Sequence, residues 1–392
     1  MATTVTRRRL LTGLGAVLAS AGLGLAGCGS QPQPTPTPTK TVAALTPTAT
    51  ETMTPTAAPT GTSIPTASPT PTPTRTPTIT PTATRNPLIN PLTGLPVASA
   101  DLLKRRPLLV RVGNDPPIRP QAGLSLADIV YEDIMDGWWV TRLTAIYLSN
   151  DPETLGPVRS ARLVTIELAN QYQGAAVHSG ASDQVRWLIS QESFVNLDEF
   201  FHPTPFYYVE GLGWMGRLHT SAPAIREYMR EKGFEAAVEL RGFTFAEEPP
   251  KGGKALSITI PYPESSVVTW RYDDEIGRYL RWQRGEPQVE RESGEQLAFD
   301  NVIIQFVEHQ ATDIVEDTNG ATSIRIVMTG SGPAWLCRDG VIAKGTWERS
   351  EKLEMTRFLD ADGEEMALKP GQTWVELVPP DYEVEVQATP EG

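Results

Sequence analysis

Cysteine is nearly absent from this 392-residue chain, which contains only two. Cys28 lies in an N-terminal segment of distinct composition, so the rest of the chain has Cys337 alone and cannot form an internal disulfide. Cys337 follows Ala-Trp-Leu, and in this apolar context we expect a buried, unreactive thiol. The fold must therefore be stabilised by burial of apolar side chains.

Histidine is also rare, and the spacing of the four residues matches no metal-ligand motif. They are His178, His202, His219 and His309. A G-x-G-x-x-G match at residues 211–216 contains the bulky Trp214, and the next helix is expected only at Pro223, too late to bind a dinucleotide. We therefore expect no metal and no cofactor, and we interpret residues 211–216 as an aromatic-bearing loop beside a pocket.

Basic residues are outnumbered, with 34 Lys and Arg against 47 Asp and Glu and a formal net charge of −13. Residues 1–86 hold six of the basic and one of the acidic residues, which leaves 28 basic and 46 acidic side chains in residues 87–392. Such a domain repels nucleic acid and anionic lipid headgroups at long range. The composition thus excludes nucleic acid as a partner, and only local clusters of arginine would bind anions.

The longest apolar stretch spans residues 10–27 and follows three arginines at positions 7–9. This order is typical of a signal peptide, of either the twin-arginine or the general secretory type. The stretch ends in Leu-Ala-Gly-Cys at residues 25–28, which resembles the lipobox of bacterial lipoproteins. We predict a signal peptide over residues 1–28 and a diacylglycerol and palmitate anchor at Cys28, which places the chain outside the cytoplasm on the membrane. The alternative is an uncleaved transmembrane helix.

Residues 29–86 consist largely of Thr-Pro repeats without apolar periodicity. Such a segment buries too little apolar surface to offset its ordering entropy, so we predict a disordered stalk. Proline keeps the stalk extended, to at most roughly 180 Å at about 3.1 Å per residue. The dense threonines also permit O-glycosylation.

Residues 87–248 alternate short apolar runs with helical patterns, which predicts an α/β layered domain. Strands are expected at 108–112, 141–148 and 175–178, and helices at 125–135, 163–172, 184–190 and 224–232. Residues 249–392 instead predict strands, at 256–260, 267–272, 279–282, 302–306, 323–328 and 374–378, with turns such as Asp339-Gly340. The fold class is therefore α+β, an N-terminal α/β layered domain followed by a β-rich C-terminal domain.

Several motifs are specific enough to indicate a family. They include Asn114, Arg-Pro-Gln at 119–121, Ala-Asp-Ile-Val-Tyr-Glu at 127–132, Gly-Pro-Val-Arg-Ser-Ala-Arg at 156–162 and Pro-Gly-Gln-Thr-Trp at 370–374. Together they resemble the YerB-like bacterial lipoproteins, which pair an N-terminal and a C-terminal domain of unknown function. The resemblance covers residues 90–380 and implies a lipoprotein, but no settled activity.

Five arginines lie in these motif loops or at the ends of elements: Arg119, Arg142, Arg159, Arg162 and Arg217. Guanidinium groups bind phosphate or carboxylate in a fork geometry, so arginines that converge would form an anion pocket. We predict such a pocket, with Asn114, Gln121 and His219 as further ligand-binding residues. The alternative is a set of structural salt bridges to Asp128, Glu132 and Asp136.

No catalytic constellation is evident. A nucleophile elbow is missing, and Glu132 and His178 are only weak candidates for moving a proton. We therefore predict an envelope lipoprotein that binds an anionic or glycan wall component or a protein partner. The alternative is an enzyme that clamps a phosphate-bearing, lipid-linked envelope precursor with the arginines, by analogy with the order of elements in envelope phosphotransferases.

Overall fold

The computed structural model describes residues 88–389. The predicted signal peptide, Cys28 and the predicted stalk lie outside these residues. No helix in the described part of the chain is long and apolar enough to cross a membrane.

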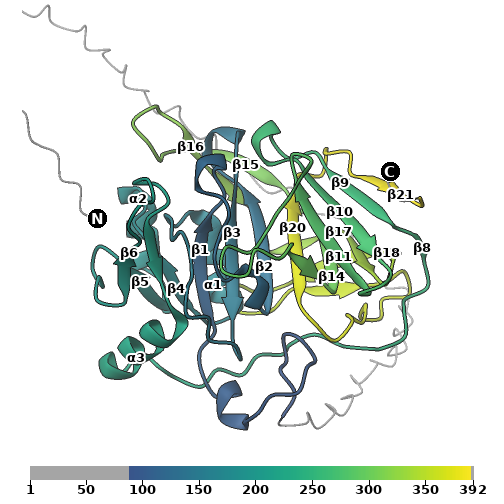
Figure 1. Ribbon diagram of the computed structural model, residues 1–392, viewed down its shortest axis with the longest axis horizontal. Helices are drawn as coiled ribbons and strands as arrows, with labels where there is room; N and C mark the ends of the chain where they lie inside the picture. The colour runs from purple at the N-terminus through teal and green to yellow at the C-terminus, as the bar shows by residue number, and fades with distance from the viewer. Residues whose placement is uncertain (1–87, 390–392) are drawn as a thin grey trace, which may run out of the picture. The chain divides into compact units, whose positions relative to one another are not determined.

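A mixed central sheet runs through the described domain, in the strand order β19-β18-β17-β14-β20-β2-β3-β1-β4-β5, with β8 paired to β18 (Figure 1). Its N-terminal strands are β1 (Leu108–Gly113), β2 (Ile129–Ile134), β3 (Thr141–Tyr147), β4 (Ala175–His178) and β5 (Val195–Asp198). Its C-terminal strands are β8 (Gly253–Lys254), β14 (Asn301–Phe306), β17 (Gly330–Arg338), β18 (Val341–Arg349), β19 (Arg357–Leu359) and β20 (Thr373–Val378).

The two halves of the chain meet where β2 pairs with β20 in parallel, with Val130 opposite Trp374. All six residues of each of these strands are buried. Because a parallel strand in the middle of a sheet is covered on both faces, both strands are apolar along most of their length. One sheet therefore contains strands from either side of residue 249.

A smaller sheet, in the order β12-β11-β10-β9-β21 with β13 paired to β11, covers one face of the central sheet. Its strands are β9 (Ser257–Ile260), β10 (Val268–Asp273), β11 (Arg278–Gln283), β12 (Glu286–Pro287), β13 (Ala298–Phe299) and β21 (Glu385–Gln387). The rings of Trp270 and Trp374 pack between the sheets with their centroids 5.4 Å apart.

Helix α1 (Leu163–Gln171) covers the opposite face of the central sheet. The Tyr131 hydroxyl of β2 is 2.8 Å from the Tyr172 hydroxyl at the end of α1, whereas the next residue, Glu132, contacts Arg281 of the smaller sheet. Successive side chains of a strand point to opposite faces, so these contacts place the central sheet between two layers.

Two more helices and two hairpins complete the domain: α2 (Asp183–Ser190), α3 (Ala222–Lys232), β6 (Phe206–Tyr208) with β7 (Leu218–Thr220), and β15 (His309–Val315) with β16 (Thr322–Ile326). The Ser221 hydroxyl accepts a hydrogen bond from the amide of Ala224 at 3.2 Å and so caps α3. That helix ends at Gly233, whose φ of 69° suits glycine.

The prediction of a helix over residues 125–135 was wrong. Residues Leu124–Leu126 form a single 3-10 turn, and Ile129–Ile134 are strand β2. The apolar run of a strand buried on both faces cannot be told from a buried helix by periodicity, and pairing with β3 and β20 decides the outcome. The other predicted helices and strands are confirmed, as is the turn at Asp339-Gly340 between β17 and β18.

Candidate functional site

The loop that follows β1 brings three predicted ligand-binding residues together. Arg119 donates from Nε to the Asn114 side-chain oxygen at 3.1 Å and from Nη2 to the Asn114 carbonyl at 2.6 Å. The Gln121 amide donates to the same side-chain oxygen of Asn114 at 2.8 Å. Asn114 and Gln121 are fully buried, so they hold Arg119 in place rather than present groups to a ligand.

Arg119 also contacts the turn between β9 and β10 of the smaller sheet, because its Nη2 donates to the Ser265 carbonyl at 2.9 Å. Burial lowers the pKa of Arg119 to about 10, while the carboxylate of Glu132 opposes that shift. The side chain thus remains a cation at neutral pH, with a fixed position.

Three of the other predicted arginines converge at the end of β1. Arg142 pairs with Gly113 across β1 and β3, and the side-chain stem of Arg159 lies so close to Gly113 that a Cβ there would be 2.7 Å from its Cγ. Arg162 precedes the first turn of α1. Burial lowers the pKa of Arg142 well below its usual value, and the guanidinium groups of Arg162 and Arg159 lower it further. We call Arg142, Arg159 and Arg162 the arginine cluster.

The members of the arginine cluster differ in their acidic partners. Arg162 forms an ion pair with Asp136 at 2.6 Å, and Arg142 lies 3.9 Å from Asp115. Arg159 has no carboxylate within ion-pair distance among the described residues, and its Nε is buried without a hydrogen-bond partner there. The cluster therefore contains one guanidinium that the described protein leaves unpaired.

The alternative of structural salt bridges holds only in part. Asp136 does pair with Arg162. Asp128 instead accepts a hydrogen bond from the Asn90 amide at 3.0 Å, and Glu132 pairs with Arg281. Only one of the three proposed acidic partners therefore binds an arginine of the cluster.

Arg217 and His219 lie on β7 or beside it and do not join the arginine cluster. The exposed Arg217 guanidinium stacks 4.6 Å from the ring centroid of Tyr208. His219 is buried, and its Nε2 is 2.9 Å from Nη1 of Arg291. Burial lowers the pKa of His219, so its ring is neutral at pH 7 and links β7 to the loop that follows β12.

The two candidate proton carriers are held by other protein groups. Glu132 accepts a hydrogen bond from the Thr141 hydroxyl at 2.5 Å and pairs with Arg281. The His178 ring lies 2.7 Å from the Asn196 side-chain oxygen and 3.1 Å from the Gly180 carbonyl. Burial lowers the pKa of His178, and its partners are neither hydroxyl nor ligand.

Arg281 and Glu376, which are fully buried between the two sheets, were not predicted from the sequence. The Arg281 guanidinium stacks 4.3 Å from the ring centroid of Trp374 and 5.2 Å from that of Trp270, and it pairs with Glu132. Alternation in β11, where Tyr279, Arg281 and Gln283 are buried, was the available signal. It indicated the face on which Arg281 lies but not its partner.

The buried carboxyl group of Glu376 should make the stability of the protein depend on pH. It accepts a hydrogen bond from Trp270 Nε1 at 2.8 Å, and burial, followed by the Glu132 carboxylate, raises the pKa of Glu376 from 4.5 to about 8. Unfolding therefore releases a proton between about pH 5 and 8, so the free energy of unfolding should fall as pH rises, by up to about 1.4 kcal/mol per pH unit from this group.

Glu376→Gln should remove that contribution. Urea unfolding of the wild type and the variant at pH 5.5 and pH 7.5 measures it, because the difference between the two pH values should be smaller in the variant. An equal pH difference in both proteins would contradict the raised pKa.

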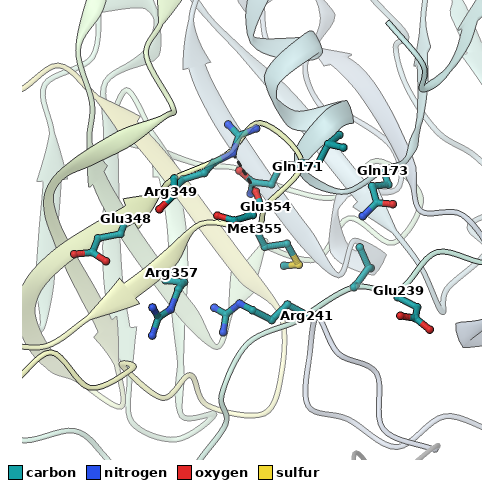
Figure 2. A pocket seen from close by; sticks show the side chains of 12 residues that line it. Gln171, Gln173, Glu239, Arg241, Glu348, Arg349, Glu354, Met355 and Arg357 are labelled. Atoms are coloured by element: carbon teal, nitrogen blue, oxygen red, sulfur yellow. Dashed lines mark hydrogen bonds between the residues drawn. The ribbon is translucent and has the colours of Figure 1, made fainter. Parts of the chain in front are cut away.

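A separate cavity of about 350 Å³ lies between the end of α1, residues 239–241 and the segment from β18 to β19 (Figure 2). Its arginines have protein partners. Arg349 pairs with Glu167 at 3.0 Å, and Arg241 and Arg357, which extend toward each other in Figure 2, both bind Glu365. This cavity therefore offers less unpaired charge than the arginine cluster. Within residues 88–389, no group of three or more His, Cys, Asp or Glu is placed to hold a metal ion.

The chain is similar to proteins of one family along most of the described domain. The N-terminal domain described as protein of unknown function DUF3048 matches residues 92–235, and the C-terminal domain of the same description matches residues 258–375. The "Putative lipoprotein YerB" of Bacillus subtilis (strain 168) is 30% identical over 296 residues, which are 74% of this chain and 85% of that protein. The crystal structure of YerB from Bacillus subtilis superimposes with a TM-score of 0.66 at 28% identity, over 76% of this chain and 99% of that one.

Proposed function

Because this chain belongs to the family defined by the DUF3048 N-terminal and C-terminal domains, we propose that it is an envelope lipoprotein whose folded domain binds an anionic component of the cell envelope. Cys28 anchors it to the outer face of the membrane, and the anion binds at the arginine cluster. The chain acts as a binding module.

One observation carries this proposal, the unpaired guanidinium of Arg159. Burial lowers the pKa of Arg159, and the neighbouring Arg162 lowers it further, while Asp115 opposes both. A partly buried cation without a carboxylate in ion-pair contact is costly, and a phosphate or carboxylate would offset that cost through paired, charge-assisted hydrogen bonds. An anion at Arg159 would also reduce the repulsion among the three guanidinium groups.

The position of the arginine cluster in the fold supports the same proposal. The Arg159 amide donates to the Arg111 carbonyl of β1 at 2.8 Å, and the Arg159 carbonyl accepts from the Ser179 amide, just after β4, at 3.1 Å. Strands β1 and β4 are parallel, so Arg159 lies at their carboxyl ends, beside the N-terminus of α1. Ligands of α/β sheets bind at this edge.

The rival proposal is an enzyme acting on a phosphate-bearing, lipid-linked envelope precursor. It requires a group that is free to move a proton beside the anion. Glu132 is engaged by Arg281 and Thr141, and His178 by Asn196 and Gly180. These contacts favour binding without turnover.

Arg159→Gln should weaken the binding of inorganic pyrophosphate at least about ten-fold, because a hydrogen bond to a charged group contributes about 1.5–3 kcal/mol. Isothermal titration calorimetry of the purified protein measures the affinity. Arg230→Gln on α3 is the matched control, since Arg230 is exposed and its one ion pair within residues 88–389 is with the exposed Glu227 at 2.5 Å.

Equal losses in the two variants would mean that net charge, rather than the arginine cluster, determines binding. No binding of pyrophosphate to the wild type would contradict the proposal. Incubation with lipid-linked glycan pyrophosphates tests the rival, since release of phosphate or of glycan would identify an enzyme.

A further inference from the structure

Three neighbouring cavities lie around Arg119 and Arg284. The first, of about 480 Å³, is lined by both arginines. The second, of about 450 Å³, is lined by Arg284 together with Trp138 and Trp139. The third, of about 260 Å³, is lined by Arg119 and the loop that carries Trp214. Arg284 lines both the first and the second cavity, and Arg119 lines both the first and the third, so the three cavities adjoin one another, and together we call them the Arg119 groove.

Exposed indole rings line both ends of the Arg119 groove. Trp139 is 65% exposed at one end, and Trp214 is 72% exposed at the other. Leaving rings of this size in water forfeits a large contribution from apolar burial, and such rings are typical of surfaces that bind a partner. The indole rings at the two ends of the groove can therefore stack on flat, weakly polar faces of a ligand.

The parts of the groove are fixed relative to one another by hydrogen bonds. Arg119 donates to the Ser265 carbonyl, and the Ser265 hydroxyl donates to the carbonyl of Trp139. At the opposite end, the Arg159 guanidinium lies 5.8 Å from the ring centroid of Trp214. The groove thus leads from Trp139 past Arg119 to the arginine cluster.

Polar groups of mixed character line the middle of the groove. Arg119 and Arg284 supply donors, and the exposed carboxylate of Glu286 supplies acceptors. Gln283 and Gln288 line the same cavity, each at most 5% exposed, and the Oε1 of each has no hydrogen-bond partner among the described residues. A ligand rich in groups that both donate and accept would suit this lining.

We infer that the Arg119 groove binds a saccharide chain, and that the arginine cluster binds the anionic group of the same ligand. Sugar rings present flat C–H faces to indoles at their sides and hydroxyl groups at their edges, which match the stacking rings and the mixed polar lining. The inference rests on the proposed function for the anion but not for the saccharide. A phosphate-bearing envelope glycan has both parts.

The test uses the full-length, lipidated protein in detergent micelles and uncharged tetrasaccharides of N-acetylglucosamine, which carry neither phosphate nor carboxylate. Calorimetry should show binding, and Trp139→Ala and Trp214→Ala should each weaken it about 3- to 10-fold, the range expected for a lost ring contact. Trp187→Ala is the matched control, because Trp187 is 61% exposed on α2 and lines none of the three cavities.

The inference is overturned if no tetrasaccharide binds, if Trp187→Ala weakens binding as much as the groove variants do, or if the peptide stem of the wall binds in place of the sugars. Circular dichroism of each variant establishes that it is folded. Pyrophosphate binding separates the two proposals, because Trp139→Ala should leave it unchanged. Loss of pyrophosphate binding with saccharide binding intact would remove only the anion site.

Discussion

Replacing Arg281 with alanine is expected to lower the free energy of unfolding by about 3–5 kcal/mol, because it leaves the buried carboxylate of Glu132 without its cation. Neither side chain of this ion pair is exposed to solvent. The substitution also removes a guanidinium that stacks on Trp374 at 4.3 Å and on Trp270 at 5.2 Å. Urea unfolding followed by tryptophan fluorescence measures the change.

Arg325→Ala is the control for this experiment, since Arg325 is exposed on β16 and its loss should change stability by no more than about 0.5 kcal/mol. The double variant Glu132→Gln, Arg281→Met should recover much of the lost stability, because it removes both charges together. A loss below about 1 kcal/mol for Arg281→Ala would show that water reaches this network. It would also contradict a dry interface between the two sheets.

Replacing Cys28 with alanine is expected to abolish lipidation and, with it, firm attachment to the membrane. Each buried methylene of an acyl chain contributes about 0.8 kcal/mol, and an anchor of two or more chains holds a protein at the membrane. The variant should be released from the membrane, or it should persist as a precursor that retains residues 1–27. Membrane fractionation and mass spectrometry of the intact protein distinguish these forms.

Cys337→Ala provides the control, because it removes the other cysteine and should leave the lipid in place. Cys337 is fully buried, and burial raises the pKa of its thiol, as expected from its apolar sequence context. A Cys28→Ala protein with an unchanged membrane fraction and a processed N-terminus would contradict the lipobox prediction. Wild-type protein that retains residues 1–27 and carries no lipid would instead support the uncleaved transmembrane helix.

The three α-helices of residues 88–389 and many of the strands were predictable, because amphipathic helices and half-buried strands leave a periodic pattern. The capped helices α2 and α3 and the strands of the smaller sheet are examples. Strand β2 was predicted as part of a helix because its residues are buried on both faces and lack alternation, and because Ser125 upstream resembles a helix N-cap. Strand β17 was missed because Gly330, Gly332 and Pro333 interrupt its apolar residues. Position 332 requires glycine, because the Cβ of any other residue would lie 2.7 Å from the Trp347 indole nitrogen.

The sequence by itself determined the family through its motif loops, the net acidic charge of the chain, and the candidate arginines. Those properties depend on residues that are close together in the chain or on the sum of its charges. Only the tertiary structure decided which arginines act together, because ion pairing depends on distance in space. It separated Arg217 from the arginine cluster, left Arg159 unpaired among the described residues, and joined Arg281 to Glu132 across 149 positions of sequence.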